Sequence, residues 1–169
     1  MDRRFLLRTP RLTLRPLEDA DADAMIRMLR DGRIRATYMI PDLGDGAAAY
    51  FARLRDLSRS PERFVYGVSL DGALIGFLND CGMDGTSAEL GYFIDPAHWG
   101  RGYATEALQA AVEELFRIGY ARVTAGYFEG NDASRRVMEK CGMRPLPGER
   151  TIPWRGEDRR CLFLAIDRT

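Results

Sequence analysis

Histidine, lysine and cysteine are scarce in this chain of 169 residues. It holds one histidine, His98, one lysine, Lys140, and three cysteines at positions 81, 141 and 161. A phosphate-binding P-loop needs a lysine directly after a glycine, and Lys140 follows a glutamate, so P-loop ATP hydrolysis is excluded. One histidine cannot form the paired-histidine motif of a zinc protease, and the cysteines form no CxxC pair. We therefore expect no metal site.

Net charge and long apolar runs are absent as well. The 25 basic residues equal the 25 acidic ones, so the chain lacks the cationic excess that holds nucleic acid or an anionic membrane. No segment approaches the about 20 apolar residues that span a bilayer. The apolar run from Phe5 to Leu7 ends at Arg8, before a signal-peptide core forms. Three cysteines are no disulfide framework and favour a reduced compartment. We expect a cytoplasmic protein with no nucleic-acid or membrane partner.

Length and composition predict one domain. A domain takes about 150 residues, and 46% hydrophobic residues is ordinary for a chain that closes one core. No Pro-, Gly- or Ser-rich linker, internal repeat or low-complexity tract interrupts the sequence. We expect residues 1–169 to form a single domain with a core from about 9 to 168, as a monomer or a homodimer.

Hydrophobic periodicity predicts an α+β chain. Period-2 alternation favours strands and apolar spacings of three and four favour helices. Asp71-Gly72 predicts a hairpin turn. The expected strands are 12–17, 64–70, 73–79, 89–94, 122–128, 143–152 and 159–166, and the expected helices are 20–29, 47–57, 104–118 and 131–141. The predicted order is β-α-α-β-β-β-α-β-α-β-β.

The segment from Glu89 to Ala107 carries the clearest signal of a site. A strand ends at Asp95-Pro96, a loop follows with Gly100 and Gly102, and a long helix starts at once. Glycines let consecutive N–H groups turn outward, and a helix start adds unpaired amides and a positive dipole end, so we predict an anion site. Thr105 stands where a dinucleotide fingerprint needs its third glycine. The alternative interpretation is a tight strand-to-helix connection without a ligand.

This segment resembles the acyl-CoA loop of the GNAT N-acetyltransferase superfamily. The family pattern Gln/Arg-x-x-Gly-x-Gly/Ala aligns with residues 99–104, where Trp99 departs from Gln/Arg. Three stretches, WGRGYATEAL, LRTPRLTLRPLEDADA and residues 131–143 with N-x-x-S-x-x-V-x-x-K-x-G-M, resemble the branch of RimJ/RimL-type ribosomal-protein N-acetyltransferases. The resemblance spans nearly the whole chain. It implies the GNAT acyl-CoA N-acyltransferase fold, a layered α+β fold with a mixed central sheet of six to seven strands and about four flanking helices.

The resemblance also implies where acetyl-CoA, the acetyl donor, would bind. In the family the pyrophosphate sits on the amides of the turn and helix start, and the pantetheine arm runs along the preceding strand. The next strand, 122–128, would splay away to admit the thioester. The implied cofactor-binding residues are Phe93, Ile94, Gly100, Arg101, Gly102, Tyr103, Ala104, Thr105, Asn131 and Ser134.

Acyl transfer from a thioester to an amine needs a base for the amine and a proton for the leaving thiolate. By analogy with the family, Glu89 is the candidate base, acting through ordered water; the alternative is that it faces solvent or pairs with an arginine. Asp80 and Glu129 are further candidates. Ser134 matches the family serine that serves as general acid, whereas Met138 stands where many branches carry a tyrosine acid. The proton donor is then Ser134 or solvent.

The remaining candidate groups receive structural interpretations. Cys141 lies on an apolar helix face without a histidine partner, so a buried thiol is expected. His98 is expected to have a surface role. In the family, the loops at 38–46 and 57–64 would wall the acceptor site.

The sequence thus predicts an acetyl-CoA-dependent N-acetyltransferase that modifies a primary amine directly. The acceptor stays open among a protein N-terminus, a polyamine, an amino acid and an aminoglycoside. The alternative function is a non-catalytic acyl-CoA-binding or regulatory module on the same fold. A nucleotide-binding oxidoreductase is opposed by the missing third glycine.

Overall fold

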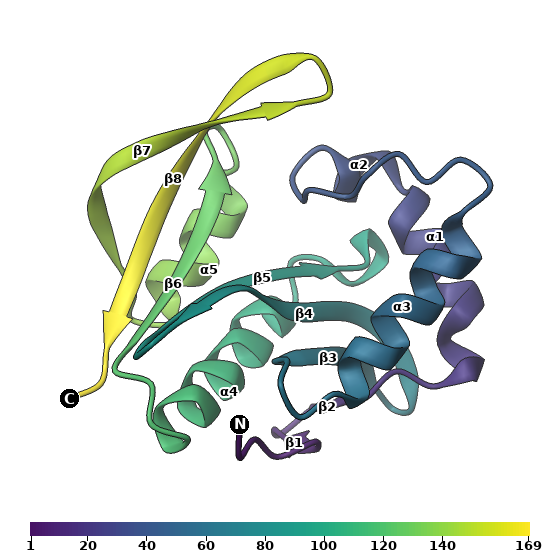
Figure 1. The fold of residues 1–169 in the computed structure, drawn as a ribbon, viewed down its shortest axis with the longest axis horizontal. Helices are drawn as coiled ribbons and strands as arrows, with labels where there is room; N and C mark the ends of the chain where they lie inside the picture. The colour runs from purple at the N-terminus through teal and green to yellow at the C-terminus, as the bar shows by residue number, and fades with distance from the viewer.

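The protein folds around one eight-stranded mixed sheet (Figure 1). The structure is a computed structural model that describes residues 1–169. The strand order is β1-β2-β3-β4-β5-β6-β8-β7, and only the β5/β6 pair is parallel. The strands are β1 (Leu7–Arg8), β2 (Leu12–Arg15), β3 (Val65–Leu70), β4 (Ala73–Asp84), β5 (Ser87–Ile94), β6 (Arg122–Phe128), β7 (Arg144–Trp154) and β8 (Glu157–Asp167). The helices are α1 (Ala22–Arg30), α2 (Gly32–Arg35), α3 (Ala47–Arg59), α4 (Tyr103–Arg117) and α5 (Asp132–Lys140), with 3₁₀ turns η1 (Asp19–Asp21) and η2 (Pro96–His98).

The predicted fold class and element order are confirmed, with two short elements added. β1 pairs with β2 at the edge of the sheet, and α2 follows α1 directly. They raise the count to eight strands and five α-helices, against the expected six to seven and about four. With two and four residues, neither element is long enough to show a hydrophobic period. None of the helices combines the length and apolar composition that crossing a bilayer requires.

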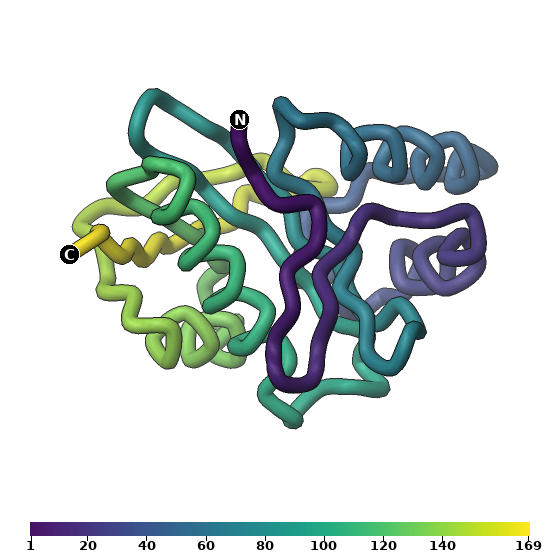
Figure 2. Tube along the Cα trace, turned by 90° about the horizontal axis from the view of Figure 1, so that it is seen from below, coloured from purple at the N-terminus to yellow at the C-terminus, as the bar shows by residue number.

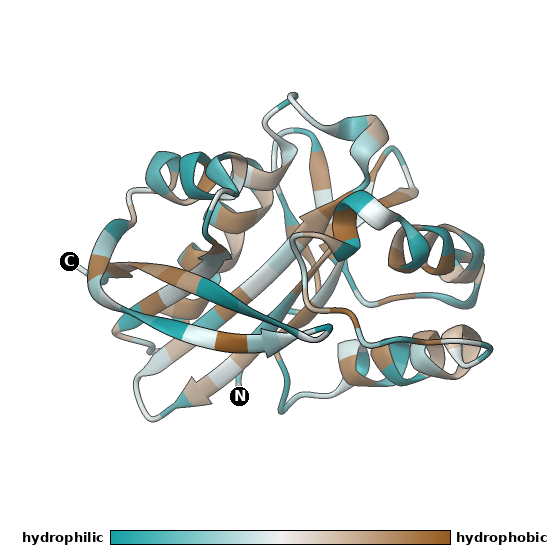
Figure 3. Cartoon of the chain, turned by 90° about the horizontal axis from the view of Figure 1, so that it is seen from above, coloured by the Kyte–Doolittle hydropathy of each residue, from teal (hydrophilic) through white to brown (hydrophobic).

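Two helical layers cover the two faces of the sheet (Figure 3). On one face α4 and α5 bury a cluster that includes Leu90, Leu108 and Met138. On the other face α1, α2 and α3 bury a second cluster with Phe77 and Phe93. Side chains alternate along β5, so its even-numbered residues face α4 and α5 and its odd-numbered residues face α1 to α3. Seen from below, the N-terminal segment runs beside α4 (Figure 2).

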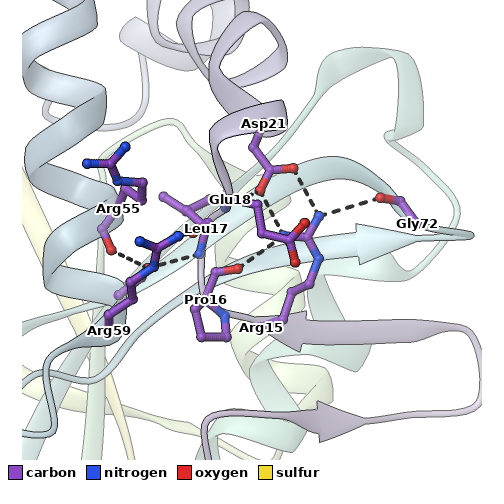
Figure 4. Close-up of polar contacts among 9 residues, drawn as sticks. Arg15, Pro16, Leu17, Glu18, Asp21, Arg55, Arg59 and Gly72 are labelled. Atoms are coloured by element: carbon purple, nitrogen blue, oxygen red, sulfur yellow. Dashed lines mark hydrogen bonds and ion pairs between the residues drawn. The ribbon is translucent and has the colours of Figure 1, made fainter.

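A buried ion pair holds the junction between β2 and α1 (Figure 4). The Arg15 guanidinium donates to both Asp21 carboxylate oxygens, at 2.7 and 2.9 Å. The same carboxylate accepts the backbone N–H of Glu18 at 2.8 Å. Next to it, the N–H of Leu17 donates to the hydroxyl of Ser58 at 2.9 Å, which ties the end of β2 to α3. These bonds satisfy polar groups that the packing of α1 and α3 has removed from water.

We expect Asp21→Ala to lower the free energy of unfolding by about 3 kcal/mol, because it removes the carboxylate that takes two hydrogen bonds from the largely buried Arg15 guanidinium. Asp23→Ala, at an exposed position two residues later in the first turn of α1, serves as control and should cost less than about 1 kcal/mol. Urea denaturation measures both. An equal loss in the two variants would contradict a special role for Asp21.

The Asp21 contribution also depends on pH. Burial raises the pKa of this carboxyl, but the hydrogen bonds from Arg15 and the Glu18 amide outweigh burial and lower its pKa overall. Stability from a carboxyl with a lowered folded-state pKa is complete above its unfolded pKa of about 3.9 and is lost as the pH falls through the folded-state pKa. The difference between the wild type and Asp21→Ala should therefore shrink on acidification below about pH 4.

β5 and β6 separate after a short parallel ladder. The ladder runs from Ser87↔Arg122 to Leu90↔Ala125, and beyond it the two strands diverge (Figure 1). β6 stays paired with β8 along its whole length, so β6, β8 and β7 swing away from β5 together. The first residues past the ladder are both glycines, Gly91 and Gly126, and neither carries a side chain. The predicted separation of strand 122–128 is confirmed.

Candidate active site

A cavity of about 960 Å³ opens where β5 and β6 diverge. Most of its lining is hydrophobic, and the lining comes from both faces of the sheet. Tyr38, Tyr50 and Phe77 line it on the side of α1 to α3, and Tyr103 and Val137 on the side of α4 and α5. The gap between the strands therefore joins two chambers that the rest of the sheet would keep apart.

The loop before α4 presents unpaired amides to this cavity. Gly100 (φ +74°) and Gly102 (φ +80°) adopt the left-handed conformation, and Gly102 is the N-cap of the 15-residue α4. The first helical bond of α4 runs from the N–H of Glu106 to the carbonyl of Gly102, and no amide of residues 100–105 donates to another backbone group. Free N–H groups at the positive end of a helix bind anions. Of the predicted loop residues 100–105, all except Arg101 line the cavity, and their backbone amides are left without backbone partners.

Arg11 supports this loop from the N-terminal hairpin, a role that the sequence did not reveal. Its guanidinium donates to the carboxylate of Glu106 at 2.7 Å and to the carbonyl of Arg101 at 2.9 Å, and it lies 4.6 Å from the ring centre of Tyr103. Burial raises the pKa of Glu106, but hydrogen bonds from Thr9 and Arg11 lower it overall, so the carboxylate stays charged. The contact between Arg11 and Glu106 joins residues far apart in sequence, which leaves no local motif.

Trp99 connects the loop back to β5. Its indole N–H donates to the carbonyl of Ile94 at 2.7 Å. Asp95 accepts the N–H of Ala97 at 3.0 Å and so caps η2. The stretch from Gly91 to Ile94 has no strand partner on the side of β6. Trp99, which departs from the family pattern, thus ties the loop to the end of β5, next to its unpaired edge.

The predicted residues Phe93 and Ile94 both line the cavity. The Phe93 ring packs edge-on against Tyr38, with ring centres 5.0 Å apart, and lies 5.7 Å from Phe77. Phe93 therefore contributes a side chain to the wall on the α1 to α3 side. Ile94 packs into the cluster under α4.

Asn131 and Ser134 lie at the start of α5, as predicted. The Asn131 side chain accepts the N–H of Ser134 at 3.2 Å and caps the helix. The Ser134 hydroxyl lies 2.9 Å from the hydroxyl of Tyr92, and all three side chains line the cavity. Burial raises the pKa of Tyr92, which keeps its hydroxyl protonated. Sequence reasoning missed Tyr92, because nothing local distinguishes it from any other strand tyrosine.

The three candidate carboxylates occupy different surroundings. Glu89 lines the cavity with its side chain 27% exposed, and its Oε2 lies 3.4 Å from a guanidinium nitrogen of Arg150. Asp80 also lines the cavity but is buried and accepts a hydrogen bond from Arg63 at 2.8 Å. Glu129 is exposed and lies outside the cavity lining. Of the two carboxylates in the cavity, Glu89 is therefore the more exposed and the more loosely paired. Its contact with Arg150 also matches the alternative prediction that Glu89 pairs with an arginine.

Tyr38 is a third side chain that the sequence did not single out, after Arg11 and Tyr92. Its hydroxyl donates to the side-chain oxygen of Asn79, and burial raises its pKa. A Cβ added at Gly91 would lie 3.1 Å from the Tyr38 ring and 2.8 Å from the sulfur of Cys81. These groups therefore crowd the glycine at the point where the strands part.

Of the two expected acceptor walls, only one reaches the cavity. Tyr38 and Met39 line it, as expected for the loop at 38–46, whereas no residue of 57–64 does. That expectation is wrong because residues 57–64 lead into β3, and β4 lies between β3 and β5.

Cys141 and His98 differ in burial. Cys141 is buried, as predicted, and burial raises the pKa of its thiol to about 12. His98 is half-buried rather than freely exposed, and it lines the cavity beside the glycine loop. His98 is the last residue of the capped turn η2.

Known proteins share this fold and sequence pattern. Residues 11–144 match the acetyltransferase (GNAT) domain family. The Bacillus subtilis uncharacterized protein YkkB is 32% identical over 163 residues, covering 85% of this chain and 87% of that protein. The probable N-acetyltransferase YjcK of the same organism is 30% identical over 156 residues, covering 81% and 82%.

Two solved structures superpose over nearly the whole chain. Mycobacterium smegmatis RimJ in complex with CoA-disulfide gives a TM-score of 0.80 at 24% identity and covers 96% of this chain and 85% of that one. RimL, a ribosomal alpha-N-protein acetyltransferase in complex with coenzyme A, gives 0.83 at 16% identity and covers 96% and 97%. At these identities the two structures show a shared fold.

Proposed function

This chain belongs to the GNAT acetyltransferase family, and we propose that it uses acetyl-CoA to acetylate a primary amine directly. The observation that carries the proposal is the cavity at the β5/β6 separation, which meets the free amides of residues 100–105. An anion site, an open strand edge and a passage between two chambers are together what an extended, anionic thioester and a separate amine need.

The residues of the site fit the acyl-CoA substrate. The amides of residues 100–105 would hold the pyrophosphate, with Lys140 and Arg136 at the cavity wall adding positive charge. The unpaired edge from Gly91 to Ile94 would accept the pantetheine arm as an added strand. Acetyl-CoA itself supplies the activated acetyl group. With no net charge on the chain, affinity then depends on these local groups.

Glu89 and Ser134 would act from opposite faces of the sheet. Glu89 is an odd-numbered residue of β5 and faces the chamber under α1 to α3, while Ser134 lies on α5 beyond the other face. The amine would enter on the Glu89 side and lose its proton there through ordered water. The sulfur would leave on the Ser134 side. This separation keeps the acid away from the amine, which must stay unprotonated to attack.

The part of the cavity on the side of α1 to α3 is the proposed acceptor chamber. Its charges favour an amine with one positive charge on an apolar body. Asp80 is buried and pairs with Arg63 at 2.8 Å, whereas Glu89 is partly exposed and pairs with Arg150 at the longer distance of 3.4 Å, so Glu89 is the lining carboxylate more available to a cation. A polyamine or an aminoglycoside would bring several charges to one carboxylate and meet the guanidinium. A protein N-terminus, the acceptor type of the RimJ/RimL branch, fits this chamber better.

Thermal denaturation tests donor binding. We expect acetyl-CoA and CoA to stabilise the protein by about 2.7 kcal/mol at a hundredfold excess over Kd, and NAD and ATP to do so far less. No response to either CoA species would overturn the proposal.

Thiol release with a panel of amines then tests catalysis. Peptides with a free N-terminus and apolar monoamines should be acetylated, and spermidine and an aminoglycoside should be poor acceptors. CoA binding without turnover of any amine would favour the non-catalytic module. Faster turnover of spermidine than of the peptides would contradict the proposed acceptor class.

A further inference from the structure

We propose that Tyr92 is a positioning residue for the release of the thiol: its hydroxyl donates to Ser134 Oγ and so directs the serine proton toward the sulfur. This inference rests on the proposed acetyl transfer and adds a residue to it. It starts from the 2.9 Å contact between the two hydroxyls, which joins β5 to the first turn of α5 across the donor side of the cavity.

Ser134 is held at two points, and Tyr92 is one of them. Asn131 accepts the Ser134 N–H at 3.2 Å and fixes the backbone, but a serine hydroxyl still rotates among three staggered positions. A donor on Oγ removes that freedom for the proton, because the serine O–H must then point away from Tyr92. The Ser134 carbonyl, which can only accept, also lies 3.3 Å from the Tyr92 hydroxyl, so the one Tyr92 proton is shared between two oxygens of the same residue, of which Oγ at 2.9 Å is the nearer.

Tyr92 is suited to donate rather than to ionise. It is packed against the cluster under α4 and α5, and burial raises the pKa of its phenol, so it remains a neutral donor at neutral pH. Met138, at the position of the tyrosine acid in other branches, is completely buried and carries no proton. The hydroxyl pair of Tyr92 and Ser134 is the nearest equivalent that this chain offers.

The proposed transfer conserves protons and electrons. The amine nitrogen bonds to the acetyl carbon and gives a proton to Glu89 through water. The electron pair of the C–S bond goes to sulfur, which takes the proton of Ser134. The oxygen of Ser134 is stabilised by the Tyr92 donor and regains a proton from solvent, to which Glu89 returns its own. The products are the N-acetyl amine and free CoA.

Tyr92→Phe tests the role, since it removes the hydroxyl and keeps the ring. We expect kcat to fall about tenfold, with KM for acetyl-CoA within a factor of about two. Ser134→Ala should lower kcat further than Tyr92→Phe does. The double variant should have the same kcat as Ser134→Ala alone, because Tyr92 acts through the serine. Tyr120→Phe, whose hydroxyl contacts Met83 away from the cavity lining, is the matched control and should keep the wild-type rate.

A donor whose leaving group needs no proton separates this role from a structural one. With p-nitrophenyl acetate in place of acetyl-CoA, Tyr92→Phe and the wild type should transfer acetyl at equal rates. Additive losses in the double variant, or an equal loss with p-nitrophenyl acetate, would overturn the inference. Full activity of Tyr92→Phe alongside an active wild type would overturn the role of Tyr92 alone, whereas a wild type that transfers no acetyl from acetyl-CoA would overturn the proposed function and this inference with it.

Discussion

Gly102→Val is expected to weaken acetyl-CoA binding at least about 30-fold. Gly102 has φ +80°, a conformation that costs a non-glycine residue about 1–3 kcal/mol and a β-branched one no less. Its added Cβ would also lie 3.4 Å from the guanidinium of Arg11, which supports the loop through Arg101. We expect relief of this strain to turn the amides of the loop away from the proposed pyrophosphate position. A loss of about 2 kcal/mol corresponds to the stated factor.

Calorimetric titration with acetyl-CoA measures the effect, and Gly72→Val provides the matched control. Gly72 has φ +87° in the β3/β4 turn, with nothing within 4 Å of an added Cβ. It carries the same backbone strain far from the anion site, so it should lose stability and keep its affinity for acetyl-CoA. Normal affinity in Gly102→Val, or an equal loss in both variants, would contradict the assignment of the loop.

Glu89→Gln is expected to slow acetyl transfer about 100-fold at neutral pH, because the amide cannot take the amine proton. The Kd of acetyl-CoA should not change, since the side chain faces the acceptor chamber. Stability should change by less than about 1 kcal/mol, because the contact with Arg150 is a long, partly exposed ion pair. Initial rates of thiol release and denaturation curves measure these quantities.

Glu129→Gln is the control for the loss of a carboxylate. Glu129 is exposed, lies outside the cavity lining and pairs with Arg160 at 2.6 Å. It should retain the wild-type rate. A wild-type rate in Glu89→Gln as well would contradict Glu89 as the base and leave Asp80 as the next candidate.

Long periodic elements are predictable from this sequence alone. The helix expected at 104–118 is observed as Tyr103–Arg117, and the Asp71-Gly72 turn joins β3 and β4 as expected. In each case the residues that decide the structure are neighbours in the chain. β4 runs to Asp84, five residues past its expected end, because pairing with β5 supports residues whose own pattern is weak.

The candidate site also combines features set by neighbouring residues with features set by long-range contacts. The sequence by itself determined the turn with free amides before α4, since two glycines and a helix start set the direction of their own amides within a few residues. Only the tertiary structure decided that Tyr92 meets Ser134, that Arg11 supports the loop and that Glu89 lies in the cavity. Those contacts depend on strand register and on where β5 and β6 part, and both follow from packing summed over the whole sheet rather than from any local pattern of residues.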